Sequence, residues 1–239
     1  MRVAAAVGLL VLLALSGCET TAEKSAQLEK AAKHTRLAQT GLQIAHASTA
    51  VKVLSATVLH DAEGTAAVVT LRNLSRHVLR EVPIAIDVEN AGGRTLFQNN
   101  APGLETALVS IPSLAPGAEQ TWVDDQVPAS GAPATVSAQV GEAPAVRGSL
   151  PAIEVQGVHL VQEASSGTAA AGTVKNRSRV AQRSLVVFAV ARRAGKIVAA
   201  GRAVLAEVPA GATAPWQLFF IGNPGGAKLE TSAPATTLG

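Results

Sequence analysis

The only cysteine of the chain, Cys18, is the most reactive side chain in the sequence. It follows two small residues, Ser16 and Gly17, and an apolar run from Val3 to Leu15, with Arg2 before that run. This order is typical of an export signal, and the run is too short for a transmembrane helix. Cleavage before Cys18 would leave this residue as the new N-terminus, and its thiol is the chemical handle for a diacylglycerol chain. The alternatives are an ordinary secretory signal with a chance cysteine, or an apolar helix that stays in place.

The segment Leu15-Ser16-Gly17-Cys18 resembles the lipobox of bacterial lipoproteins. The resemblance implies a signal peptide over 1–17 and an envelope protein anchored through acyl chains such as palmitate on Cys18, on the periplasmic or extracellular face. Glu19 follows the lipidated position, where an Asp is the usual inner-membrane retention signal in Gram-negative sorting. In a Gram-negative cell, the resemblance therefore favours the outer membrane. A single cysteine also excludes an intramolecular disulfide.

Other groups that could do chemistry are scattered along the chain. The sequence has no G-x-S-x-G, Walker or G-x-G-x-x-G motif. Asp124-Asp125 is the one adjacent acidic pair, but Ca²⁺ needs six to eight oxygen ligands, so we expect a solvated turn there. We therefore expect no catalytic residues, no metal and no cofactor. Five histidines lack metal-ligand spacing: His34, His46, His60, His77 and His159.

A basic row offers one candidate binding surface. Lys175, Arg177 and Arg179 alternate along the chain and would share one face if this stretch is extended, and Arg183 follows after a turn. They could hold phosphate or carboxylate groups of an anionic polymer. The alternative is a solvated basic edge that prevents edge-to-edge aggregation.

The two parts of the chain carry opposite net charge. Residues 51–150 hold six Lys/Arg and ten Asp/Glu, a net of −4, whereas residues 151–239 hold nine and four, a net of +5. Attraction between the parts, an anionic surface facing the distal part, or incidental drift would each explain this. Aromatic residues make up only 3% of the chain, which disfavours nucleic-acid binding by base stacking.

An internal duplication places these residues in an architecture. The segment 70–76 (TLRNLSR) matches 173–179 (TVKNRSR) at an offset of 103, and Trp122 matches Trp216 at an offset of 94. The nine-residue difference falls between Gln98 and Ser110, so the first copy should carry a longer loop or an extra strand there. We expect both Trp side chains in the core. The sequons at Asn73 and Asn176 are expected to be turns rather than glycosylation sites.

Each copy has the period of a β-strand. Residues 82–89 alternate apolar and polar, 51–59 and 153–161 should be first strands, and Gly64 and Gly167 should open second strands. Short strands with regular turns and no helical stretch predict an all-β fold. We expect two tandem immunoglobulin-like β-sandwich domains, preceded by the signal peptide and a short helical tether.

A second candidate surface is apolar. Val186, Phe188 and Val190 occupy outer positions of their predicted strand, where the first copy has Pro83, Ala85 and Asp87. We expect these three side chains to cover a neighbour, either domain one or a partner protein. Burial under loops of the second copy is the alternative.

The second copy also resembles two families of bacterial immunoglobulin-like repeats, the FxLYD-type and CARDB-type domains. The likeness rests on the segments 172–176 (GTVKN), 194–198 (AGKIV) and 208–211 (VPAG) and is looser in the first copy. The aromatic signature of the FxLYD family is missing, because the chain has no Tyr. The resemblance implies extracytoplasmic binding or spacer modules without catalytic residues.

Together these patterns divide the chain into six segments. Residues 18–49 should form a helical tether, because 21–33 has high helix propensity, and the end of the chain is rich in Gly, Pro, Thr and Ala. The expected segments are signal peptide 1–17, tether 18–49, domain one 50–143, linker 144–151, domain two 152–223 and flexible tail 224–239.

The function expected from the sequence is a protein-binding or scaffolding module, anchored to a membrane through Cys18, with an envelope protein as partner and no nucleic acid. Adhesion to an anionic cell-wall polymer or lipid surface through basic domain two is the alternative.

Overall fold

The computed structural model describes residues 41–129, 131–163 and 167–238. Over these residues the chain is all-β, as predicted, with antiparallel sheets, no α-helix and one 3₁₀ turn, η1 (Thr106–Leu108). The signal peptide 1–17 and most of the tether 18–49 lie outside the described residues. The described end of the tether, 41–49, contains no helix, and Ala47 bridges to Gly141.

The first half of the described chain, residues 51–146, forms two sheets. β3 is the central strand of the larger sheet, with β4 and β5 on one side and β7 and β8 on the other. The smaller sheet has the order β1-β2-β6. The strands are β1 (Val51–Asp61), β2 (Gly64–Asn73), β3 (Val78–Asn90), β4 (Thr95–Gln98), β5 (Ser110–Leu114), β6 (Glu119–Asp124), β7 (Pro133–Val140) and β8 (Ala145–Val146).

The second half, residues 153–238, also forms two sheets. One has the order β13-β10-β9 and the other β14-β12-β11-β15. The strands are β9 (Ile153–Glu163), β10 (Gly167–Asn176), β11 (Gln182–Arg193), β12 (Lys196–Val208), β13 (Thr213–Phe219), β14 (Ile221–Gly222) and β15 (Lys228–Ser232).

Strand register confirms the duplication. Val69 pairs with Trp122 in the first half, and the equivalent Gly172 pairs with Trp216 in the second. The insertion in the first copy is confirmed as well. β12 runs unbroken alongside β11, whereas its counterpart in the first half is divided into β4 and β5 by a loop that contains η1.

The predicted Asn turns are confirmed, and each is built around a fully buried amide. Asn176 Nδ2 donates to the carbonyls of Val180, Val208 and Pro209, while its Oδ1 accepts from the backbone N and the Oγ of Ser178. Asn73 makes the equivalent five bonds in the first half. Both side chains are 0% exposed, which leaves no room for a glycan.

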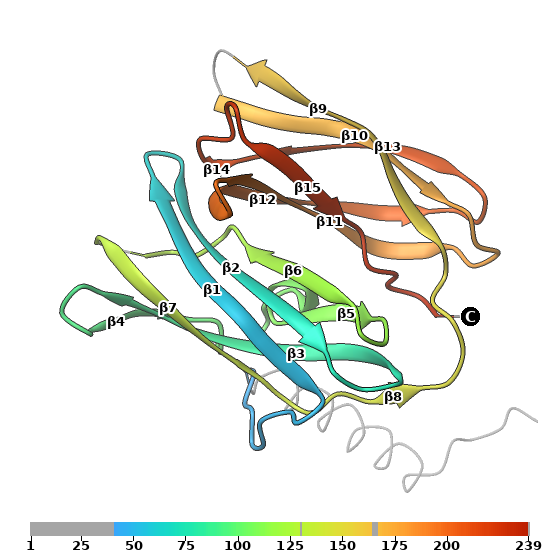
Figure 1. Ribbon diagram of the computed structural model, residues 1–239, viewed down its shortest axis with the longest axis horizontal. Coiled ribbons are helices and arrows are strands. Elements are labelled where there is room, and N and C mark those ends of the chain that lie inside the picture. Colours follow the sequence, from blue (N-terminus) through green and yellow to red (C-terminus); the bar gives the residue numbers. More distant parts are fainter. Residues whose placement is uncertain (1–40, 130, 164–166, 239) are drawn as a thin grey trace, which may run out of the picture. The chain divides into compact units, whose positions relative to one another are not determined.

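Hydrophobic packing orders the four sheets into a stack (Figure 1). One hydrophobic cluster joins the β3 sheet, the β1-β2-β6 sheet and the outward side chains of β11, β12 and β14. A second cluster joins the inward side of the β11 sheet to the sheet of β9, β10 and β13. Trp122 lies in the first cluster and Trp216 in the second, as predicted for core residues. Residues 65–71 of β2 and 185–191 of β11 are buried without a break, because each strand is covered on both faces.

Two segment predictions need correction. The tail from residue 224 was expected to be flexible, but β15 pairs with the edge of β11, and the Gln182 side chain bonds the backbone of Thr236 and Thr237. The composition of the tail does not indicate this strand, because its partner strand, β11, lies far away in sequence. Within the expected linker 144–151, β8 belongs to the first half, since it pairs with β3.

Replacing the buried amide of Asn176 tests the turn. Asn176→Ala would leave three carbonyls without this donor, so we expect the free energy of unfolding to fall by about 2–3 kcal/mol in a urea titration. Asn223 is the matched control, because it is exposed and accepts a single bond from Gly225, and its Ala variant should lose less than about 0.5 kcal/mol. Equal losses in the two variants would contradict this account of the turn.

Candidate functional site

The junction between the two halves is where the predicted apolar surface lies. Val186, Phe188 and Val190 are 1%, 1% and 2% exposed and belong to the cluster that contains Val68 and Val123 of the first half. The structure therefore places these three side chains against the first half of the chain, where the expected neighbours were domain one or a partner protein. In this arrangement they are not open to a partner protein.

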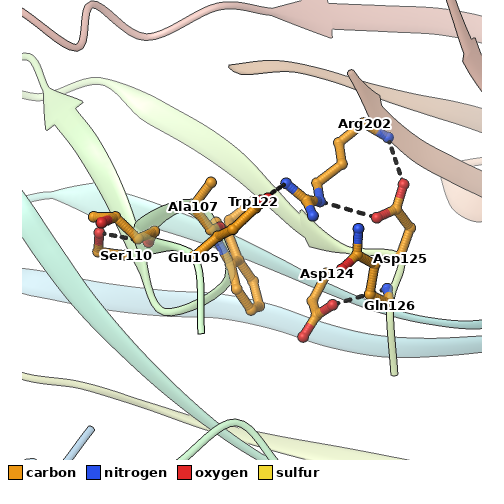
Figure 2. A network of polar contacts seen from close by, with 9 residues as sticks. Glu105, Ala107, Ser110, Trp122, Asp124, Asp125, Gln126 and Arg202 are labelled. Carbon is orange, nitrogen blue, oxygen red and sulfur yellow. Dashed lines mark hydrogen bonds and ion pairs between the residues drawn. The ribbon is translucent and has the colours of Figure 1, made fainter. Parts of the chain in front are cut away.

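A buried ion pair crosses this apolar junction (Figure 2). Arg202 on β12 donates from Nε to Oδ1 of Asp125 at 2.9 Å and from its backbone N to Oδ2 of the same carboxylate at 3.0 Å. Its Nη1 also lies 3.2 Å from Oε2 of Glu105. The Arg202 side chain is 3% exposed, whereas those of Asp125 and Glu105 are 17% and 62% exposed. Asp125 is thus the inner partner of the guanidinium, and Glu105 is the outer one.

The inserted loop of the first copy positions Glu105. Trp122 Nε1 donates to the Ala107 carbonyl at 2.7 Å, and Ser110 Oγ donates to the Thr106 carbonyl at 2.9 Å, which fixes the loop around η1 (Figure 2). The second copy lacks this loop. Among the described residues, the buried Nε1 of the equivalent Trp216 has no acceptor. The insertion therefore satisfies a core indole and supplies a carboxylate to the junction.

The prediction of a solvated turn at Asp124-Asp125 is wrong. Asp124 is 1% exposed, and it is directed into the first half because its strand partner Ala67 lies in the core there, whereas Asp125 faces Arg202. Successive side chains of an extended strand point to opposite faces, so one carboxylate enters each side of the sheet. The sequence showed the adjacent acids but not which face each would take.

Burial dominates the electrostatics of both carboxyl groups. It raises the pKa of Asp124 to about 6, although the backbone N of Gln126 donates to this carboxylate at 2.9 Å. Burial also raises the pKa of Asp125 above its ordinary value, outweighing the attraction of Arg202. The pair therefore gains less net stability than its short distances suggest, and its main effect is to tie β6 to β12 in one register.

The structure divides the predicted basic row between two places. Lys175 Nζ donates to the Gly211 carbonyl at 2.6 Å, and Arg177 pairs with Glu154 on the neighbouring β9 at 2.5 Å. The side chains of Arg177 and Glu154 are about half exposed, and their hydrogen bond lowers the pKa of Glu154. Arg179 lies on the exposed turn between β10 and β11. Arg183 belongs to another sheet and lines a cleft of about 320 Å³ at the junction, opposite Glu81.

Arg202 is the site residue that the sequence analysis did not select. The sequence does contain an indication that Arg202 has a buried partner, because it is the one charged residue within the apolar run 197–205. A charge inside such a run requires a buried partner, but the partner, Asp125, directly follows β6 and is 77 positions away.

Among residues 41–129, 131–163 and 167–238, no three His, Cys, Asp or Glu side chains gather into a cluster that could hold a metal ion. No helix in the same part of the chain is long and apolar enough to span a membrane.

Comparison with known proteins adds no relative. No protein-family model and no curated protein sequence matches the chain. Cys18, the predicted lipidation site, lies outside the described residues.

The raised pKa of Asp124 predicts a pH-dependent stability. Its folded pKa of about 6 exceeds the ordinary value of 3.8, so its contribution is fully present below pH 4 and is lost as pH rises through 6. Unfolding free energies from pH 4 to 8 should therefore show Asp124→Asn more stable than the wild type by up to about 3 kcal/mol at pH 7.5, with little difference at pH 4. A pH-independent difference would rule out the assigned titration.

Breaking the buried pair from the other side should be costly. Arg202→Met leaves the Asp125 carboxylate without its counter-charge, and we expect a loss of about 3–5 kcal/mol in urea unfolding. Arg72 pairs with Glu119 at 3.8 Å with both side chains about half exposed, so Arg72→Met is the matched control and should lose less than about 1 kcal/mol. A similar small loss in both variants would show that the Arg202 pair adds nothing.

Proposed function

We propose that the chain is a lipid-anchored, non-enzymatic protein of the cell envelope that serves as a protein-binding or scaffolding module in a membrane-associated assembly. The observation that carries the proposal is the joining of two copies of one β unit through buried sheet faces and the Arg202–Asp125 pair. A pair of modules joined in this way holds its outer surfaces at fixed positions, which suits a scaffold. The export-type segment that ends in Cys18 supports the envelope location.

Each half is, in this proposal, an immunoglobulin-like β-sandwich of the FxLYD or CARDB type. Support comes from the two antiparallel sheets in each half and from a buried Trp at the same register position in both. Domains of this kind are stabilised by packing between two sheets and place their binding surfaces on loops, strand edges and outer faces.

Lipidation of Cys18 would fix the chain to a membrane on the periplasmic or extracellular side. The outer membrane is the expected location in a Gram-negative cell, because Glu19 rather than Asp follows the cysteine. A single acyl chain anchors weakly, so more than one chain on Cys18 would be needed for stable attachment.

Adhesion to an anionic polymer is the second candidate, and the exposure of Arg179 and Arg183 favours it. The two functions differ in their response to salt. Polymer binding through Lys and Arg weakens steeply as ionic strength rises, whereas an apolar protein interface does not.

Cross-linking in cells tests the proposed function. The full-length protein is purified from its native envelope at low and high salt, and a discrete protein partner that survives high salt is the expected result. Cys18→Ser is the matched variant, and it should incorporate no labelled fatty acid. Polymer or lipid alone, lost in high salt, would overturn the protein-binding proposal, and a Cys18→Ser protein that still incorporates the label would overturn the anchor.

A further inference from the structure

Equivalent sheet faces of the two halves have different surroundings. In the first half, the outward side chains of the β1-β2-β6 sheet include Ala66, Val68 and Val123, all 0% exposed, and they pack with the Phe188 side chain of β11. In the second half, the β13-β10-β9 sheet ends the stack, and no described element is paired or clustered on its outward side. The second half thus repeats a face that is covered in the first half and leaves it open.

The residues of this open face follow from strand register. Ala170 and Val174 of β10 lie in the core, so Ala169, Ala171 and Thr173 between them point outward. The outward neighbours of β10 on the two flanking strands are His159, Val161 and Glu163 of β9 and Pro215, Gln217 and Phe219 of β13.

The open face has both a projection and a hollow. Phe219 is 43% exposed, an unusual position for a large aromatic side chain. A shallow groove of about 490 Å³ lies two strand positions further along, over Ala171 and Thr173 and beside Pro215. Because the residues of β10 here are small, a second sheet can approach to the usual spacing of about 10 Å.

Charge is arranged symmetrically about Ala171. Glu163 lies at the level of Gly167, four positions before Ala171, and Lys175 lies four positions after it. Phe219 lies at the level of Ala169, two positions before Ala171, and the groove residue Thr173 lies two positions after it. A two-fold axis that lies between the two facing sheets, passes near Ala171 and runs across the strands would therefore place Glu163 of one copy near Lys175 of the other and Phe219 over the groove of the other.

We propose that the open face is the interface of a two-fold homodimer, with the axis passing near Ala171. Opposite charges and a projection facing a hollow on one surface are the features that a self-complementary interface requires. The buried junction inside each chain is the precedent, since the equivalent face of the first half is already covered by a second sheet. The dimer places two anchored chains side by side and is independent of any envelope partner.

A cysteine at the axis tests this proposal on the full-length chain in its native envelope. Packed sheets about 10 Å apart are too far apart for a direct disulfide, so two copies of Ala171→Cys should instead be joined into a covalent dimer by a short thiol-reactive bis-maleimide. Ala85→Cys is the matched control, because Ala85 also points outward from the central strand of a sheet at the end of the stack, and it should give no such dimer. The wild type, with Cys18 alone, controls for background cross-linking. An equal yield of dimer from the two variants would overturn the proposal, as would a cross-link from position 171 to a different protein.

Charge exchange separates a specific interface from general adhesion. In the Ala171→Cys background, Phe219→Asp should lower the dimer yield at least about tenfold, because it would bury an unpaired carboxylate. Glu163→Lys should also lower the yield, and Glu163→Lys combined with Lys175→Glu should restore it. Failure of restoration in a folded double variant would reject the assigned axis. The dimer is scored without reference to a captured partner, so this result and the test of the proposed function can fail separately.

Discussion

Burial of β2 and β11 on both faces is the constraint that organises the molecule. Residues 65–71 and 185–191 are buried without interruption, so each strand needs a sheet on either side. A fully buried Val or Phe contributes roughly 1.5–3 kcal/mol relative to an exposed one. The junction holds several such residues, including Val68, Val123, Phe188 and Val190. Separating the halves would expose them, and the two halves therefore fold into one unit although each repeats the same strand pattern.

The Arg202–Asp125 pair contributes to this junction differently from the apolar contacts. Aliphatic side chains tolerate sliding between packed sheets, because dispersion and burial are not directional. An arginine that bonds one carboxylate through both its side-chain Nε and its backbone N ties β12 to the residue that follows β6 in one position. Burial raises the pKa of Asp125 despite the nearby cation, so the pair adds only modest stability to the fold. Its larger effect is to select one position of β12 relative to Asp125.

Local patterns in the sequence predicted most of the fold. The alternation in 82–89, the Asn-x-Ser turns and the placement of both Trp residues depend on neighbours in sequence or on the duplication, and the structure confirms them. The features that were missed depend on contacts between distant segments. β15 exists because the edge of β11 is free to pair with it, and the burial of Asp124 depends on which way β6 faces. Composition carries no information about such partners, so the Gly- and Pro-rich composition of residues 224–239 predicts a flexible tail where the structure has β15.

The two copies of the duplicated unit differ in the residues of their outer sheet faces. Position 125 of the first copy corresponds to position 219 of the second, and there the internal ion-pair partner Asp125 is replaced by the exposed Phe219. On the other sheet the change runs the opposite way, since the acidic Asp87 and Glu89 of the first copy become Val190 and Arg192 in the second. Each copy thus has one apolar outer face and one polar or mixed face. Because the apolar face of β11 packs on the first copy, it is used inside the chain, and the remaining outward aromatic group, Phe219, lies on the face at the far end of the stack.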